Sequence, residues 1–143
     1  MICQTLDVMV SLEPDVGLGR SEVRKARKRL GDAGEEMAAR ELTRRGYTVR
    51  ERNWRCPEGE LDLVAEQDGA LVFVEVRTRR GDRFGTPEES ITPVKRAHLI
   101  ASAQAYLQAH SLDCDWRIDV IAIEMSSRGE LLRVDVIENA IEG

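Results

Sequence analysis

Residues 60–77, ELDLVAEQDGALVFVEVR, predict a β-hairpin around which the rest of the domain is built. The Asp68-Gly69 pair between two apolar runs is the strongest short-range hairpin signal, because both residues tolerate positive φ. The valine-rich run from Ala70 to Arg77 is typical of a strand, and so is the run from Glu60 to Glu66. With Asp68 and Gly69 as the loop, opposed residues have numbers that sum to 137, which sets the predicted register.

The predicted register places four charged side chains on one face of the hairpin. Asp62 is expected opposite Glu75, and Glu60 opposite Arg77. Because side chains alternate between the faces of a strand, all four project together. The other face is aliphatic and is expected to be core; it carries Leu61, Leu63, Ala65, Val72, Val74 and Val76.

Opposed carboxylates destabilise a sheet unless a positive charge lies between them. Arg77 is one candidate for that charge, and a divalent cation held by Asp62 and Glu75 is the other. Carboxylate oxygens favour Mg²⁺ or Mn²⁺, and such an ion polarises a phosphodiester and activates an attacking water. Arg77 is then expected to stabilise negative charge on the phosphate. The alternative is a purely structural salt-bridge cluster formed by these three residues and Glu60.

A helix is predicted before the hairpin, over residues 32–45. Its first residue, Asp32, is expected to cap it, with Glu35 completing a capping box and Gly46 ending it. A short basic helix, Ser21–Leu30, is expected before it and is interrupted by Gly31. Glu35 lies in the middle of the apolar stripe of the helix, where a carboxylate needs a partner. The alternative is that Glu35 only caps the helix and reaches water.

The remaining elements complete an α/β domain with a central mixed β-sheet flanked by helices. The order is helix, three strands, helix, two strands, and Thr92 and Pro93 are expected to start the second helix. The expected spans are a strand over 47–54, a loop over 79–89, a helix from 93 to about 110, and strands over 116–124 and 131–137. Residues 1–19 are expected to form a flexible N-terminal extension, and residues 20–143 a single domain.

Composition excludes several classes of protein. The chain has 143 residues, of which 42% are hydrophobic and 33% are charged, so it is long enough for one globular core. Its longest uncharged stretch, residues 97–112, contains several polar residues, so no membrane span is expected. Three widely spaced cysteines and two histidines form no zinc or disulfide pattern. Together with the lack of a secretory signal pattern, they favour a cytoplasmic protein.

The charges are strongly segregated although the net charge is −5. Residues 56–75 carry 6 acidic side chains and no basic one, whereas residues 20–55 carry 12 basic and 6 acidic side chains. Residues 76–98 are again basic, with 6 cations against 3 acids. An acidic strip between basic segments suits a metal site beside a surface for a polyanion, although a solvated charged surface is the alternative. The candidate nucleic-acid contacts are Asn53, Arg55, Arg79, Arg80 and Lys95.

Four segments together resemble the YraN-type family of uncharacterised bacterial proteins. They are GEEMAARELTRRGY (34–47), RNWRCPEGELDLVA (52–65), VFVEVRTR (72–79) and RIDVIAIE (117–124). That family is similar to the PD-(D/E)xK nuclease superfamily and, within it, to the archaeal Holliday junction resolvases. The resemblance implies a restriction-endonuclease-like core in αβββαβ order, and it makes a homodimer conceivable because those resolvases work as dimers.

The resemblance also implies roles for individual residues. Glu35 matches the glutamate of the first helix, Asp62 the metal-binding aspartate, and Glu75 the glutamate of the E-x-K element. Arg77 stands where that element has lysine, and an arginine stays charged and cannot act as a base. A catalytic set of Glu35, Asp62, Glu75 and Arg77 is therefore expected, with Mg²⁺ or Mn²⁺ bound by Asp62 and Glu75.

Three functions are consistent with these observations. The first is a metal-dependent nuclease-like protein that acts on DNA phosphodiesters, in branched or damaged DNA. The second is a non-catalytic nucleic-acid-binding or adaptor protein, with DNA or RNA as its partner, that keeps the nuclease fold. The third is a protein-interaction module without a nucleic-acid partner. Arginine in the lysine position leaves enzymatic activity open.

Overall fold

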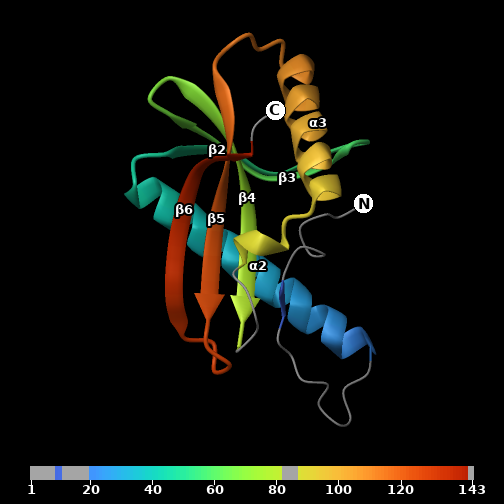
Figure 1. The fold of residues 1–143 in the computed structure, drawn as a ribbon, viewed down its shortest axis with the longest axis vertical. Coiled ribbons are helices and arrows are strands. Elements are labelled where there is room, and N and C mark those ends of the chain that lie inside the picture. The colour runs from blue at the N-terminus through green and yellow to red at the C-terminus, as the bar shows by residue number, and fades with distance from the viewer. Residues whose placement is uncertain (1–8, 11–19, 82–86, 142–143) are drawn as a thin grey trace.

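The computed structural model describes residues 9–10, 20–81 and 87–141, and these form an α/β domain with a mixed sheet. Helix α2 (Arg20–Arg44) and helix α3 (Pro93–Ala109) lie on opposite sides of the sheet (Figure 1). The short elements are β1 (Met9–Val10) and the 3₁₀ turn η1 (Glu88–Ser90). The long strands are β2 (Thr48–Cys56), β3 (Gly59–Gln67), β4 (Ala70–Arg80), β5 (Trp116–Met125) and β6 (Leu131–Ile141).

The long strands are ordered β2-β3-β4-β5-β6 in the sheet. Strands β4 and β5 are parallel and are joined by the crossover through α3, whereas the other neighbours in this order are antiparallel. Strand β1 lies parallel to the last two residues of β4. This architecture confirms the predicted α/β class with its central mixed sheet, and it is consistent with a restriction-endonuclease-like core.

The predicted hairpin and its register are confirmed for the half nearest the turn. Asp68 and Gly69 both have positive φ, 52° and 81°, as a type I′ turn requires. The ladder runs from Gln67 opposite Ala70 to Leu63 opposite Val74, and there it ends. The predicted cross-strand pairs Asp62–Glu75 and Glu60–Arg77 are therefore wrong, because the two strands part before reaching them.

Helix α2 corrects the prediction of two helices separated at Gly31. It is continuous over 25 residues, so Asp32 lies within the helix and pairs with Lys28 rather than capping it. A glycine in a helix interior costs only about 1 kcal/mol, and tertiary contacts readily offset that cost. The second glycine, Gly34, lets α2 approach β4 closely, because a Cβ there would lie 2.2 Å from Thr78 Oγ1.

The expected end of α2 and start of α3 are both confirmed. Gly46 has a φ of 91°, and the amide of Tyr47 bonds the carbonyl of Leu42 at 2.9 Å, as in a Schellman motif. Thr92 accepts a hydrogen bond from the Lys95 amide at 3.1 Å, with Pro93 as the first helical residue. The end of α2 and the start of α3, and with it the side chains of the first turn of α3, are thus set by local sequence.

The strands extend further than predicted at two places. Strand β4 continues to Arg80, so Arg79 and Arg80 belong to the sheet and not to the predicted loop. Strand β6 continues to Ile141 instead of ending at Ile137. Much of the predicted loop over 79–89, and nearly all of the predicted N-terminal extension over 1–19, lie outside the described residues, so the flexibility of that extension stays a prediction.

Each face of the sheet packs into its own hydrophobic core. On the α2 face, Leu42 and Ala38 pack against Val72, Val74 and Ile121. On the α3 face, Tyr106 and Leu99 pack among aliphatic and aromatic side chains that include Phe73, Ile118 and Val120. Strand β4 is buried on both faces, so its charged side chains lie inside the protein whichever face of the sheet they point to.

Replacing Gly34 by alanine is expected to destabilise the protein by about 1–3 kcal/mol, the usual cost of overpacking. In an unhindered helix interior the same change stabilises, but here the new methyl group meets Thr78 Oγ1. Urea unfolding of Gly34→Ala, Thr78→Ala and the double variant measures this contact. The double variant should recover most of the loss, and a Gly34→Ala protein as stable as the wild type would contradict the prediction.

Candidate functional site

Four carboxyl side chains gather where β3 and β4 part. Glu60 and Asp62 come from β3, Glu75 from β4 and Glu35 from the middle of α2. All four residues are buried, with exposed fractions of 2%, 0%, 0% and 6% in that order. Burial of so many acids is costly unless other groups compensate them. We refer to these four residues as the acid cluster.

The side chain of Asp62 replaces a backbone hydrogen bond that β3 no longer provides to β4. Its Oδ2 accepts a hydrogen bond from the Val76 amide at 2.8 Å, beyond the last paired residues of the hairpin. The backbone of β4 is thereby satisfied although β3 has turned away. The same bond keeps the Asp62 carboxylate beside the segment of β4 that carries Glu75 and Arg77.

Glu75 is flanked by two cations that both approach its Oε2. Arg77 Nη2 lies 3.3 Å away and Lys95 Nζ lies 3.5 Å away. Lys95 comes from the first turn of α3, where the helix dipole disfavours a cation, so the nearby carboxylate is what stabilises it there. The sequence predicted Lys95 as a nucleic-acid contact, and the structure places it against the acid cluster instead.

Glu35 has a strongly altered protonation equilibrium. Burial, followed by the neighbouring charges of Asp62, Asp32 and Glu60, raises the pKa of Glu35 to about 8, and a hydrogen bond from Asn53 opposes this shift. The alternative that Glu35 only caps the helix and reaches water is wrong, because it lies inside α2 and is 6% exposed. Within the described chain, its Oε1 has no hydrogen-bond partner.

The other predicted nucleic-acid contacts lie in different surroundings. Arg55 is at the mouth of the cluster, with its side chain 57% exposed and its Nε 3.8 Å from Glu60 Oε1. Arg79 is mostly buried in an ion pair with Glu124 at 2.7 Å. Arg80 donates two hydrogen bonds to the Ser127 carbonyl, at 3.2 and 2.9 Å. The acid cluster therefore gathers Asn53, Arg55 and Lys95, whereas Arg79 and Arg80 are engaged elsewhere in the sheet.

A second buried polar group lies around Asp119 on β5. Its carboxylate accepts hydrogen bonds from the Tyr47 hydroxyl and the Asn139 amide, each at 2.8 Å, and pairs with Arg117. Burial, together with the adjacent Asp119, raises the pKa of Tyr47 to about 12. Each strong donor and acceptor here has a partner, so this group anchors the start of β2 to β5 and β6 rather than offering a site.

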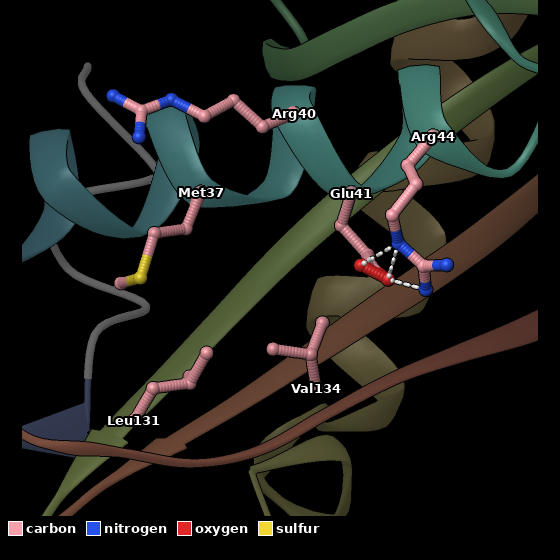
Figure 2. A pocket seen from close by; sticks show the side chains of 6 residues that line it. All are labelled: Met37, Arg40, Glu41, Arg44, Leu131 and Val134. Carbon is pink, nitrogen blue, oxygen red and sulfur yellow. Dashed lines mark hydrogen bonds and ion pairs between the residues drawn. The ribbon is translucent and has the colours of Figure 1, made fainter.

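A shallow groove between α2 and β6 is also separate from the acid cluster (Figure 2). Met37, Leu131 and Val134 form its apolar lining, and Arg44 closes one side through its ion pair with Glu41. The Arg44 hydrogen bond lowers the pKa of Glu41, so both groups stay ionised at neutral pH. The groove thus contains no group suited to acid–base or metal chemistry.

The acid cluster has the donor chemistry of a Mg²⁺ or Mn²⁺ site. Mg²⁺ commonly uses one or two carboxylates and completes its shell with water and phosphate oxygens. Asp62 and Glu75 provide two such carboxylates on strands that the Asp62–Val76 bond holds together. In the part of the chain that the structure describes, no three His, Cys, Asp or Glu side chains are already arranged around one ion position. The two carboxylates fit the ion, with solvent and substrate supplying the remaining ligands.

Comparison with known sequences gives consistent matches over most of the chain. The model of the uncharacterised protein family UPF0102 matches residues 34–123. A UPF0102 protein of Roseiflexus castenholzii is 56% identical over 118 residues, which cover 81% of this chain and 95% of that protein. Similar proteins of Dehalococcoides mccartyi and Caldicellulosiruptor saccharolyticus are 44% and 40% identical, over 80% of this chain and 94% and 98% of their own lengths. Among the described helices, neither α2 nor α3 is long and apolar enough to cross a membrane.

Glu35 should make the protein less stable as the pH rises from 5 to 8. Its pKa is about 8 when folded against 4.5 for an ordinary glutamate, so in this interval only the unfolded chain releases the proton. Urea unfolding across this range should show that Glu35→Gln gains stability relative to the wild type as pH increases.

Glu36→Gln is the matched control for this measurement. Glu36 is the next residue of α2, but its hydrogen bonds with Arg52 and Arg40 lower its pKa. Its stabilising effect is therefore already complete above pH 5, and its pH profile should run parallel to that of the wild type. Parallel profiles for Glu35→Gln and the wild type would contradict the assignment of the raised pKa.

Proposed function

This chain belongs to the uncharacterised protein family UPF0102, and we propose that it is a Mg²⁺- or Mn²⁺-dependent nuclease-like protein acting on DNA phosphodiesters. The observation that carries the proposal is the burial of two carboxyl groups, Asp62 of β3 and Glu75 of β4, on the strands that part there, together with the buried Glu35 of α2. Such a concentration of buried acids is costly for the fold, and function is the usual reason for retaining it.

Each residue of the cluster has a distinct role in this proposal. Asp62 and Glu75 hold the ion, which when bound polarises the phosphate and lowers the pKa of the attacking water. Asp62 keeps its orientation because Oδ2 is fixed by the Val76 amide. Arg77 and Lys95 flank Glu75 and balance charge that develops on the phosphate oxygens.

Glu35 is the group of the cluster best suited to proton transfer. A general acid or base works best with a pKa near the working pH, and the pKa of Glu35 is about 8. Arg77 cannot take this role because a guanidinium stays protonated. The hydrogen bond from Asn53 stabilises the charged form of Glu35 and so keeps its pKa from rising further.

The nature of the substrate rests on the resemblance to archaeal Holliday junction resolvases. It supports branched or damaged DNA as the form acted on and a homodimer as the working unit, whereas the cytoplasm as the compartment rests on the unpaired cysteines and the lack of a secretory signal pattern. Plasmid and junction substrates should therefore be compared directly. RNA remains the second nucleic-acid partner to include in the same comparison.

A specific observation favours a second candidate, a nucleic-acid-binding or adaptor protein without cleavage. Glu75 Oε2 already has two cations within 3.5 Å, so its negative charge is balanced by the protein itself. An acid cluster that is neutralised internally can persist as a structural feature. Metal binding separates the two candidates, because the adaptor does not need it.

Asp62→Asn should lose Mg²⁺ binding and lower cleavage by roughly a hundredfold or more, the scale of removing one essential electrostatic group. The asparagine still offers an acceptor to the Val76 amide, so the fold should survive. Calorimetric titration with Mg²⁺ and Mn²⁺, alongside plasmid and junction cleavage, measures both effects. Glu66→Gln, an exposed acid on the same strand, is the control, and undiminished cleavage by Asp62→Asn would exclude the nuclease proposal.

Lys95→Met should bind Mg²⁺ more tightly, by about tenfold, which corresponds to ~1.4 kcal/mol. Lys95 Nζ and the ion compete for the charge of Glu75, so removal of the ammonium favours the ion. The metal-free variant should also unfold at a lower temperature, since buried acids lose a counter-charge. Arg96→Met, an exposed cation next to it in the same helical turn, should change neither quantity. Weaker Mg²⁺ binding by Lys95→Met would show that the two do not compete.

A further inference from the structure

The N-terminal half of α2 is a cationic surface without an assigned role. Among the side chains described between Arg20 and Arg29, five exposed ones are cationic and a single one, Glu22, is acidic. This concentration contrasts with the net charge of −5 for the whole chain. The exposed cations are Arg20, Arg24, Lys25, Lys28 and Arg29, and we refer to them as the basic face of α2.

Packing of the described core does not account for this half of the helix. None of its described side chains belongs to either hydrophobic core, and the first core residue of α2 is Ala38, with Met37 packed beside it. Figure 1 shows this blue half of α2 continuing past β4. Lys28 pairs with Asp32 at 3.1 Å, but both side chains are exposed, so this ion pair contributes little to stability.

The spacing of the basic face suits a nucleic-acid backbone. At 1.5 Å per residue, Arg20 and Arg29 are about 13.5 Å apart along the helix, a length of about four base pairs of duplex DNA. At 100° per residue the five cations fall within about half of the helix circumference. Val23, which is partly buried, lies on the opposite side. The cations can therefore contact a row of phosphates together.

The basic face leads directly to the acid cluster. Glu35 follows Arg29 by six residues on the same continuous helix, or about 9 Å. The cations close to the cluster are each paired with one of its acids, Arg77 and Lys95 with Glu75 and Arg55 with Glu60. Arg79 and Arg80 are held in contacts within the protein. Attraction for a phosphate backbone must therefore come from outside the cluster, and the basic face is the nearest such source on α2.

The composition of the basic face of α2 and its surroundings also favours nucleic acid over an anionic lipid surface as the partner. A helix that lies on a membrane needs an exposed apolar face to insert among acyl chains. Of the side chains that the structure describes between Arg20 and Arg29, the exposed ones are charged, apart from Ser21. Binding through this surface is then electrostatic and depends strongly on salt.

We propose that the basic face of α2 binds the sugar–phosphate backbone of duplex DNA and directs the adjoining phosphodiester to the acid cluster. The identity of the polyanion rests on the proposed function, whereas the location of the surface rests on the charge and geometry of α2. Arg24 and Arg29, one on each side of the exposed arc, are the contacts that test it.

The test compares two double variants of the same helix with equal loss of charge. Arg24→Gln/Arg29→Gln alters the basic face, and Arg40→Gln/Arg44→Gln alters exposed cations of the other half, beside the α2–β6 groove (Figure 2). Fluorescence anisotropy with a short DNA duplex, between about 50 and 200 mM salt and with EDTA present, gives the slope of log K against log salt. Circular dichroism verifies that both variants keep the helix.

For the Arg24→Gln/Arg29→Gln protein, the slope of log K against log salt should become shallower by about 1.8, since each phosphate contact contributes about 0.9. The Arg40→Gln/Arg44→Gln protein should keep the wild-type slope. Equal losses in both variants, no loss in the first, or a wild type that does not bind duplex DNA would overturn the inference. So would an unchanged DNA slope in the first variant combined with weaker binding to phosphatidylserine vesicles.

Asp62→Asn separates this inference from the proposed function. If Asp62→Asn and the wild type bind DNA with the same slope and neither cleaves, the basic face is supported while the nuclease proposal fails. If the wild type cleaves and Arg24→Gln/Arg29→Gln binds and cleaves like it, the inference fails while the nuclease proposal stands. The two conclusions thus have independent outcomes.

Discussion

The hydrogen bond from the Val76 amide to Asp62 Oδ2 is the contact on which the arrangement of the site depends. It allows β3 to leave β4 without exposing an unsatisfied backbone amide in the interior. The place where the strands separate is lined by Asp62 and Glu60 of β3 and by Glu75 of β4. Glu35 of α2 lies close enough to Asp62 and Glu60 for their charges to raise its pKa. A ladder that continued to the end of β3 would fill this region with ordinary cross-strand pairs. The acid cluster is therefore a consequence of a backbone constraint that one side chain resolves.

Local signals in the sequence were sufficient for the features that depend on neighbouring residues. The Asp68-Gly69 turn, its register, the Gly46 end of α2 and the Thr92 cap of α3 each follow from the conformational preferences of two to five residues. The α/β class follows in turn from the order of those elements. The hairpin pattern predicted Asp62 and Glu75 on one face, and only the family resemblance joined Glu35 to them; the structure places Glu35 close enough to Asp62 for that charge to raise its pKa.

The errors in the sequence-based predictions arose where contacts between distant residues determine the structure. Gly31 and Asp32 resemble a helix boundary, yet α2 continues because its glycine at position 34 packs against Thr78 of β4. The sequence does not show where the β3–β4 ladder ends, because the alternation itself breaks there: Leu61 packs in the core under α3, whereas Leu63 packs in the core under α2, and Asp62 between them bonds the Val76 amide. Lys95 looked like a surface cation of a first helical turn, and only the placement of α3 against β4 brings it to Glu75. No pattern within a single element carries that information.

The continuity of α2 couples two regions that are usually considered separately. Gly34 contacts β4 beside Thr78, Glu35 enters the acid cluster next to it, and the basic face begins less than two turns away. Without a break at Gly31, these three segments form one uninterrupted helix. A ligand held on the basic face is therefore attached to the same element that carries Glu35 into the interior.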